Sequence, residues 1–308
     1  MHLHKKLCRC CGQHAFERLS PDAEVGQFFL QYGLQITLTS KPGVRRTFLD
    51  KLERKWPKSL PALVPSISRL LKLQSESNAT ARMSYGLCAN CSFLAPWPEI
   101  SNDHLLDYYS YYLSSKYKEE RIKIEPGYSV FAPLHGCKQE FLVRRNFHTN
   151  FMATVLNQHA SRKEISDMRL LDYGGGDGGI QPVLNFAEIH TYDVGECLPS
   201  LGFYDVVQCM HVLEHVGNPL ATIREAFDCC MTGGLLYVEV PYEFTSVENY
   251  VNGRLPVIDE HINKFSIESV RAMLESLGGN ILSVEEGSIE ILHLKGSARV
   301  VRGLVQRL

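Results

Sequence analysis

The sequence predicts an α/β fold: a mostly parallel sheet that finishes on a reversed strand, with a small cysteine-bearing domain in front of it. From about residue 139 onward, short apolar runs of strand length alternate with helical patterns, which is typical of a sheet with crossover helices. Before about residue 125 the chain is irregular and rich in cysteine and tyrosine. A length of 308 residues also favours two domains. We therefore expect a first domain over 1–125 and a second over 126–308.

The first elements of the second domain follow from their apolar spacing. Apolar side chains at helical spacing within 147–155 predict a helix that leads into the sheet. Short apolar runs then predict strands at 168–173 (MRLLDY), 187–194 (AEIHTYDV) and 204–211 (YDVVQCMH). In an open α/β sheet, ligands bind in the crevice at the carboxyl ends of the strands, so we expect the site there.

The next elements have clear boundary residues. Asn218 followed by Pro219 predicts the start of a helix, because asparagine caps a helix and proline suits its first position. Gly233 is expected to end this helix. The run 235–240 (LLYVEV) is then expected to be a buried strand.

The last elements are one helix and two strands. Ser266 is expected to cap a helix with an inward apolar face. The runs 280–286 (NILSVEE) and 289–294 (IEILHL) predict two strands joined by a tight turn at Gly287 and Ser288. This hairpin would supply the reversed strand of the sheet.

A glycine-rich loop follows the first predicted strand, in the stretch LLDYGGGDGGI (170–180). Backbone amides in such a loop, together with the start of a following helix, attract anionic groups. A G-x-G-x-x-G pattern from Gly174 fits dinucleotide binding, while a D-x-G-x-G-x-G pattern from Asp172 fits S-adenosylmethionine (SAM). Asp193, at the end of the next strand, can accept from the ribose hydroxyls of either ligand. The glycine-rich loop alone is compatible with both a dinucleotide and SAM.

The stretch YDVVQCMHVLEHVGNP (204–219) resembles the class I SAM-dependent methyltransferases, whose fourth strand typically opens with aspartate and runs into such an LEH segment. GGLLYVEVP (233–241) and EHINKFS (260–266) resemble later segments of the same family, so that the likeness covers about 165–295. It implies that Asp172 lies near the methionine end of SAM, and that Asp193 holds the ribose. The cofactor-binding residues expected from it are Asp172, Tyr173, Gly174, Gly176, Gly178, Asp193, Val194, Met210 and His211.

One departure from that family concerns the segment between Asp193 and Asp205. The family normally fits a helix and a strand there, including an acidic residue that reads the adenine amino group. The segment VGECLPSLGFY is too short for both. We therefore expect the third strand of the family to be reduced or absent, and assign no adenine-reading residue.

Two C-x-x-C pairs, Cys8 with Cys11 and Cys88 with Cys91, predict a structural zinc site. Each short loop presents two thiolates, and two loops complete a tetrahedron with no open position. Such a site stabilises a small domain whose own core is insufficient. Cys10 is the spare cysteine of the group. The alternative is four reduced, metal-free cysteines.

The segments CRCCG, LCANCSFLAPWP and DYYSYYLSSKY resemble methyltransferases with an N-terminal zinc-binding domain, among them C-methyltransferases of nucleotide-linked deoxysugars. This resemblance implies that Tyr112 passes close to the active site and that Glu260 and His261 supply a base. Methyl transfer from an activated donor needs alignment and, for a poor nucleophile, a base near neutral pKa. His215 is the second candidate for that base; otherwise it shapes the crevice wall. We expect a small acceptor, sugar-like or another secondary metabolite, methylated at carbon or oxygen.

Two other functions remain open. An insertion at about 41–80 is basic, since residues 41–72 carry nine lysines and arginines against two acidic residues. A solvated helical face is the most common explanation of such a charge run; the alternative is an RNA methyltransferase whose affinity would fall with salt, although few aromatic side chains are present there for stacking. The shortened segment after Asp193 is also compatible with a methyltransferase-like protein that binds partners without catalysis.

Composition excludes some partners and compartments. The longest apolar stretches fall far short of the roughly 20 residues that span a bilayer, so no membrane segment is expected. The amino terminus lacks the apolar core of a secretory signal, so we expect a cytoplasmic protein. The formal net charge of -2 favours no charged partner.

Overall fold

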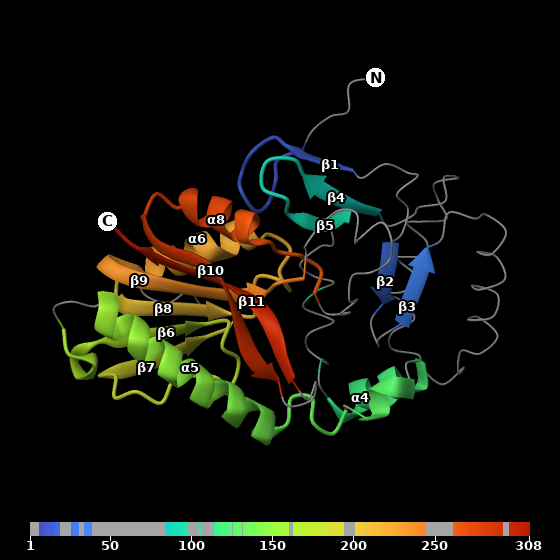
Figure 1. Ribbon diagram of the computed structural model, residues 1–308, viewed down its shortest axis with the longest axis horizontal. Coiled ribbons are helices and arrows are strands. Elements are labelled where there is room, and N and C mark those ends of the chain that lie inside the picture. Colours follow the sequence, from blue (N-terminus) through green and yellow to red (C-terminus); the bar gives the residue numbers. More distant parts are fainter. Residues whose placement is uncertain are drawn as a thin grey trace.

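A computed structural model gives the architecture of the chain (Figure 1). It describes residues 6–18, 26–30, 34–38, 84–97, 105, 112, 114–124, 126–130, 132–159, 163–193, 201–243, 261–291 and 296–308. The basic insertion at 41–80 lies outside these residues. The strands are β1 (Phe16–Arg18), β2 (Gly26–Leu30), β3 (Leu34–Leu38), β4 (Ser84–Cys88), β5 (Leu94–Trp97), β6 (Arg169–Tyr173), β7 (Glu188–Tyr192), β8 (Tyr204–Met210), β9 (Cys230–Pro241), β10 (Asn280–Ile291) and β11 (Gly296–Gln306). The helices are α4 (Ser115–Ile124), α5 (Lys138–His159), α6 (Pro219–Cys229) and α8 (Ile267–Glu275), with short 3-10 turns η2 (Pro126–Val130) and η3 (Ile165–Asp167).

The largest sheet has six strands in the order β10-β11-β9-β8-β6-β7. The four strands from β9 to β7 pair in parallel, while β11 runs antiparallel to both of its neighbours. This confirms the predicted mostly parallel sheet with a reversed last strand. It also brings the ends of β6, β7 and β8 to one edge, where the glycine loop begins.

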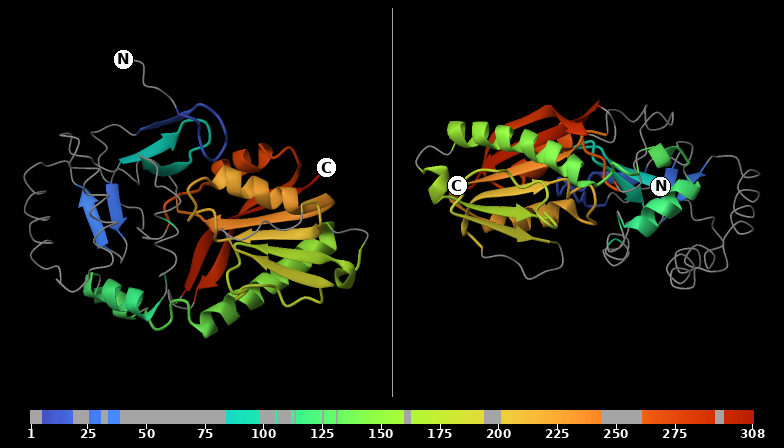
Figure 2. Two further views of the ribbon diagram at one scale, coloured as in Figure 1. Left: turned by 180° about the vertical axis from the view of Figure 1, so that it is seen from behind. Right: turned by 90° about the horizontal axis from the view of Figure 1, so that it is seen from below.

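Helices cover both faces of the sheet, with α5 on one face and α6 and α8 on the other (Figure 1, Figure 2). The strand period of two explains how one strand serves both layers. Leu170 belongs to an apolar cluster on one face of the sheet together with Met152 of α5. Its neighbour Leu171 belongs to a second apolar cluster, on the other face, together with Ile223 of α6. β8 is buried along its whole length, as expected of a central parallel strand.

The predicted strands at 168–173, 187–194 and 204–211 correspond to β6, β7 and β8. No strand pairs with the outer edge of β7 in the part of the chain that the structure describes, which agrees with a reduced third strand. Residues 194–200 lie outside that part.

No helix follows the glycine loop in the described stretch up to β7. Residues 174–187 form turns and extended chain that lead directly into β7. Pro182 has no N–H to continue a helix and its ring clashes with the preceding turn. The loop is held on α5 instead, where the amide of Val183 donates to Oγ1 of Thr149 at 2.9 Å.

The predicted tight turn at Gly287 and Ser288 is also wrong, because β10 runs unbroken through both residues. A Cβ at Gly287 would lie 2.6 Å from Nη1 of Arg302, so this glycine makes room for the side chain of an arginine on the neighbouring strand β11. Similarly, α6 ends at Cys229 rather than at Gly233, since Cys230 is extended and begins β9.

The cysteine-bearing segments fold as an antiparallel sheet in the order β1-β4-β5. This unit is packed on the large sheet's helical layer: Phe93 stacks against Phe265 with ring centroids 5.3 Å apart, and the backbone of Leu94 pairs with that of Lys264. Its cysteines share one apolar cluster with α6 and α8. Among the described helices, none combines the length and apolarity that crossing a membrane requires.

Candidate active site and metal centre

The glycine loop leaves β6 through three residues with left-handed backbone, Gly174 (φ +76°), Gly176 (φ +55°) and Gly178 (φ +74°). A Cβ at Gly174 would lie 2.4 Å from Cγ2 of Val212, so this position accepts glycine alone without displacement. A Cβ at Gly176 would meet nothing within 4 Å, so its backbone borders open space. The loop therefore combines one tightly packed glycine with bare main chain that a ligand can approach.

Asp172, at the end of β6, is buried beneath this loop with 3% of its surface exposed. Its Oδ1 accepts from Nε2 of Gln208 at 2.8 Å, and Oε1 of Gln208 lies 2.9 Å from Nε2 of His148. Burial raises the pKa of Asp172, against the lowering effect of the Gln208 hydrogen bond. Burial also lowers the pKa of His148, so a neutral imidazole donates from Nε2 to Gln208. This chain of three side chains fixes the Asp172 carboxylate across two strands and α5.

Asp193 directly follows β7 and is exposed. The amide of Gly174 donates to the carbonyl of Tyr192 at 2.7 Å, so the glycine loop and the start of the Asp193 segment lie at the same end of neighbouring strands. Val194 lies outside the described residues.

A cluster of an acid and two histidines, Glu214, His215 and His261, lies beyond the end of β8; we call it the acid–histidine cluster. Oε1 of Glu214 is 3.7 Å from Nε2 of His215, and the two imidazole rings are 4.9 Å apart. His211 lies between Oε1 of Glu214 and Oε1 of Glu239, 3.2 Å from each. Burial and a nearby arginine oppose the charged form of His211, but the two carboxylates outweigh them and raise its pKa. His211 also has φ +54°, an uncommon backbone for a residue with a side chain, and such strain is often found at functional sites.

His261 is oriented by a buried carboxylate that the sequence did not reveal. Nδ1 of His261 is 2.7 Å from Oε1 of Glu243, and Nζ of Lys264 donates to Oε2 of the same carboxylate at 2.8 Å. Burial opposes ionisation of Glu243, but His261 and Lys264 outweigh it and lower its pKa to about 2. Glu260, expected to be the partner of His261, lies outside the described residues.

Asn263 joins the two loops that carry the acid–histidine cluster. Its Nδ2 donates to the carbonyls of Leu213 at 2.8 Å and Val216 at 2.7 Å. The next residue, Lys264, pairs through its backbone with Leu94 of the cysteine-bearing sheet. The position of His261 therefore depends on both the large sheet and the cysteine unit.

Comparison with known proteins identifies this region. Residues 144–284 match the family described as "Methyltransferase domain". This part of the chain has the Rossmann-like α/β fold of methyltransferases, and we refer to residues 144–284 as the methyltransferase domain after the family they match.

Individual relatives of the methyltransferase domain are distant. A ubiquinone biosynthesis O-methyltransferase of Colwellia psychrerythraea is 27% identical, and the match covers 35% of this chain and 54% of that protein, so the chain spans about half the length of this curated relative. Among solved structures, magnesium protoporphyrin IX methyltransferase of Synechocystis PCC 6803 with bound SAM is 14% identical, covering 67% of this chain and 98% of that one with a TM-score of 0.40. A SAM-dependent methyltransferase of Leishmania major is 12% identical, covering 57% and 76% with a TM-score of 0.39.

Two of the expected cofactor residues contribute side chains to the core of the methyltransferase domain rather than to its surface. Tyr173 is 1% exposed and its hydroxyl donates to Oε2 of Glu225 on α6 at 2.9 Å, so its backbone alone remains available to a ligand. Met210 packs in the apolar cluster under α5.

Tyr112 belongs to an aromatic group before α5. Its ring packs edge-on against Tyr117 at 5.2 Å, and its hydroxyl lies 3.3 Å from Nε2 of His135. The other ring nitrogen of His135 lies 2.8 Å from the hydroxyl of Tyr128. This arrangement gives Tyr112 a fixed place just before α4.

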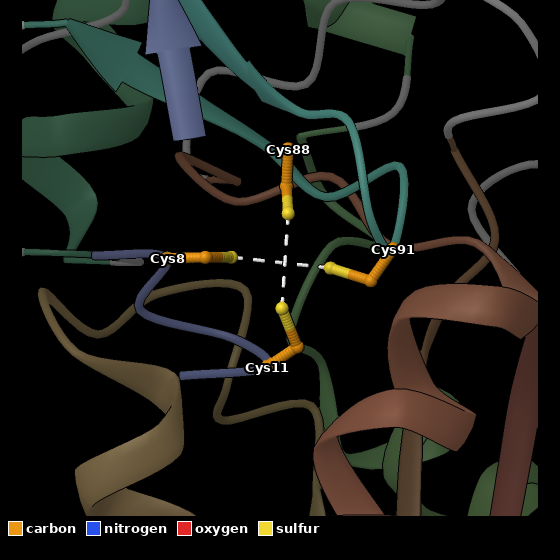
Figure 3. Close-up of side chains that lie close together, drawn as sticks. All are labelled: Cys8, Cys11, Cys88 and Cys91. Carbon is orange, nitrogen blue, oxygen red and sulfur yellow. Dashed lines mark hydrogen bonds between the residues drawn. The ribbon is translucent and has the colours of Figure 1, made fainter. Parts of the chain in front are cut away.

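Cys8, Cys11, Cys88 and Cys91 converge on one point from two loops, as Figure 3 shows. All four are buried. Sγ of Cys8 is 3.9 Å from Sγ of Cys91, and Sγ of Cys11 is 3.7 Å from Sγ of Cys88. Zn–S bonds of about 2.3 Å in a regular tetrahedron place the sulfurs about 3.8 Å apart. The four sulfurs therefore fit a tetrahedral Zn²⁺.

Electrostatics within the cysteine cluster favour a cation there. Hydrogen bonding between Cys8 and Cys88 raises the pKa of Cys8 and lowers that of Cys88. The thiols themselves thus stabilise the thiolate of Cys88 and oppose that of Cys8. Cys10 is not part of the tetrahedron: its Sγ donates to the carbonyl of Ser269 on α8 at 3.2 Å and joins the unit to the methyltransferase domain.

Proposed function

We propose that the protein transfers a methyl group from SAM to a small-molecule acceptor. The observation that carries this proposal is the match of residues 144–284 to the methyltransferase-domain family, a stretch that contains both the glycine loop and the acid–histidine cluster. The loop's bare backbone at Gly176, at the same end of neighbouring strands as Asp172 and Asp193, is consistent with a bound nucleoside.

In this proposal each expected cofactor residue has a distinct task. Asp172, fixed by Gln208, lies at the methionine end of SAM, and Asp193 accepts from the ribose hydroxyls. The main chain of Tyr173, Gly174, Gly176 and Gly178 approaches the ligand. Val194 flanks the adenine and His211 lines the crevice, whereas Met210 borders it with its backbone alone, because its side chain packs in the core.

The acceptor is placed at the acid–histidine cluster, which is partly open to solvent: the side chains of His215 and His261 are 19% and 14% exposed. Loss of a proton there makes the acceptor a better nucleophile. With Nδ1 engaged by Glu243, Nε2 of His261 can take the acceptor's proton, and His215 is the second candidate. Tyr112 is assigned to the acceptor side of the site. The name of the curated relative, an O-methyltransferase, favours oxygen as the methylated atom.

We assign the four cysteines to a structural Zn²⁺. The sulfur distances and complete burial support four thiolate ligands with no open position. Its role is to hold the 263–265 segment, and through it His261, against the methyltransferase domain.

Calorimetric titration of the full chain with SAM tests the function directly. Binding by the wild-type protein, weakened at least about 10-fold by Asp193→Ala, is expected from loss of the charge-assisted ribose contact. Asp167→Ala is the matched control, since Asp167 is an exposed aspartate in η3. Absence of SAM binding at millimolar concentration would contradict the proposal and favour a binding protein without catalysis. Binding that falls steeply with salt for RNA, but not for small acceptors, would favour an RNA substrate instead.

A further inference from the structure

The acid–histidine cluster has the composition and spacing of a metal-binding site. Glu214, His215 and His261 each offer one ligand atom, and these three atoms lie within 4.8 Å of one another. They come from two loops, one after β8 and one before α8, that Asn263 ties together: its amide donates to the carbonyl of Glu214 at 3.1 Å. The three side chains are therefore held in place by backbone contacts.

Glu214 carries the strongest indication of a cation-binding role. It is 0% exposed, and neither of its carboxylate oxygens has a hydrogen bond within the described residues. Nδ1 of His211 lies 3.2 Å from Oε1 of Glu214 and Nε2 of His215 lies 3.7 Å from the same oxygen, so two imidazoles face this carboxylate. Burying a carboxylate without such bonds is costly unless a charge compensates it directly.

The surroundings of His261 match the outer shell of a metal ligand. A histidine that binds a metal usually donates its second ring nitrogen to a carboxylate, which fixes the ring and its tautomer. Glu243 provides that carboxylate at 2.7 Å from Nδ1 and is itself anchored by Lys264. Nε2 of His261 is then left with the lone pair that a metal requires.

We propose that Glu214, His215 and His261 bind a divalent first-row transition metal, such as Mn²⁺, Fe²⁺, Co²⁺ or Zn²⁺. One carboxylate and two imidazoles form a ligand set that suits these ions better than Ca²⁺ or Mg²⁺, which prefer oxygen ligands alone. Three protein ligands leave coordination positions open for another molecule. The partial exposure of the two histidines provides the opening.

The ion's role rests on the proposed methyltransferase function. An acceptor hydroxyl bound at an open position would lose its proton more readily, because the metal stabilises the resulting alkoxide or phenolate. The O–H bond breaks, the proton passes to solvent, and the oxygen's electron pair forms the new bond to the methyl carbon as the sulfonium S–C bond breaks. The acceptor class is thus an oxygen nucleophile; with the ion bound, Nε2 of His261 is a metal ligand, and the acceptor's proton goes to solvent in place of His261.

This centre differs in chemistry from the four-cysteine site, which allows the two to be distinguished. The full chain is treated with EDTA under conditions in which metal analysis shows the cysteine-bound zinc to be retained, and is then titrated with Co²⁺. Cobalt bound to nitrogen and oxygen shows weak visible d–d absorption, whereas cobalt exchanged into thiolates adds intense near-ultraviolet charge transfer. We expect one Co²⁺ per chain with the first spectrum and without the second.

Glu214→Gln and His261→Ala are expected to raise the Kd for Co²⁺ at least about 100-fold, and Glu243→Gln by about 10- to 100-fold, as for other partners of metal-bound histidines. His190→Ala, on the exposed edge strand β7, is the control for loss of a histidine. Far-ultraviolet circular dichroism and SAM calorimetry on each variant show whether it is folded. No second metal in the wild-type protein, or undiminished Co²⁺ binding by Glu214→Gln and His261→Ala, would overturn the site. If the wild-type protein binds SAM in that case, the metal proposal fails and the methyltransferase proposal stands. If the wild-type protein binds Co²⁺ at this site but does not bind SAM, the methyltransferase proposal fails and the metal site stands.

Discussion

Replacing Gly174 with alanine tests why the glycine loop needs glycine at its first turn. An alanine at φ +76° costs about 1–2 kcal/mol because its Cβ crowds the following carbonyl oxygen. The new Cβ would also lie 2.4 Å from Cγ2 and 2.9 Å from Cγ1 of buried Val212, and overpacking of that kind costs about 1–3 kcal/mol. We therefore expect Gly174→Ala to lower the free energy of unfolding by about 2–5 kcal/mol, measured by urea denaturation without SAM.

Gly176→Ala is the matched control, since Gly176 has φ +55° but a Cβ there meets nothing within 4 Å. It should cost about 1–2 kcal/mol, from backbone strain alone. In a Val212→Ala background, the cost of Gly174→Ala in free energy of unfolding should fall to that of Gly176→Ala, because the crowding methyl groups are gone. Equal costs for the two glycines in the wild-type background, or no relief from Val212→Ala, would refute the steric explanation.

Three further predictions concern the cysteine site, a buried ion pair and the clamp between the loops. Cys88→Ser should abolish the bound zinc in metal analysis and lower the free energy of unfolding by more than about 4 kcal/mol, because a buried three-thiolate site cannot close around the ion; full zinc content in this variant would contradict the assignment. Burial opposes ionisation of Glu239, but His211 and Arg302 outweigh it and hold its pKa below the ordinary value of 4.5. Glu239 therefore stabilises the fold above that value, and this contribution is lost as the pH falls from there through the lower pKa of the folded state. Chemical denaturation from pH 6 downward should show a shallower acid loss in Glu239→Gln than in the wild type. Asn263→Ala leaves two loop carbonyls without their donor and should cost about 2 kcal/mol, at about 1 kcal/mol per hydrogen bond, with unchanged stability as the refuting result.

Local sequence patterns, which involve residues close together in the chain, predicted most of the fold. The helix at α5 and the strands β6, β7 and β8 followed from local apolar spacing, because burial of one face imposes a period of 3.6 or 2 on the sequence. Asn218 was expected to cap α6, and its side chain does accept from the amide of Ala221. These signals lie within a few residues of the feature they specify.

The structural roles of glycines were predicted less reliably, because a glycine can make a turn, end a helix or leave space for a neighbouring side chain. Gly287 was expected to make a turn, yet it lies inside β10 to leave space for Arg302, a residue on another strand. Gly233 was expected to end a helix that had already ended at Cys229. In both cases the reason for the glycine lies in a neighbour that is distant in sequence.

The candidate site was found in part. His215, His261 and the four cysteines were identified from motifs, whereas Gln208, Glu239 and Glu243 were not. A polar residue inside an apolar strand, such as Gln208 in YDVVQCMH, is the signal that could have found the first two. Glu243 follows β9 with no such contrast, so nothing in its local sequence sets it apart.

The sequence by itself determined the α/β class, the glycine loop and the four-cysteine site, because each is specified by residue types at short fixed spacings. The tertiary structure alone decided which groups face one another: Gln208 against Asp172, Glu243 against His261, and a buried Glu214 without a hydrogen bond among the described residues. The physical reason is that charge compensation in a protein interior acts through space over a few ångströms. Partners separated by many residues, like Glu243 and His261, leave no mark in the sequence until the chain is folded.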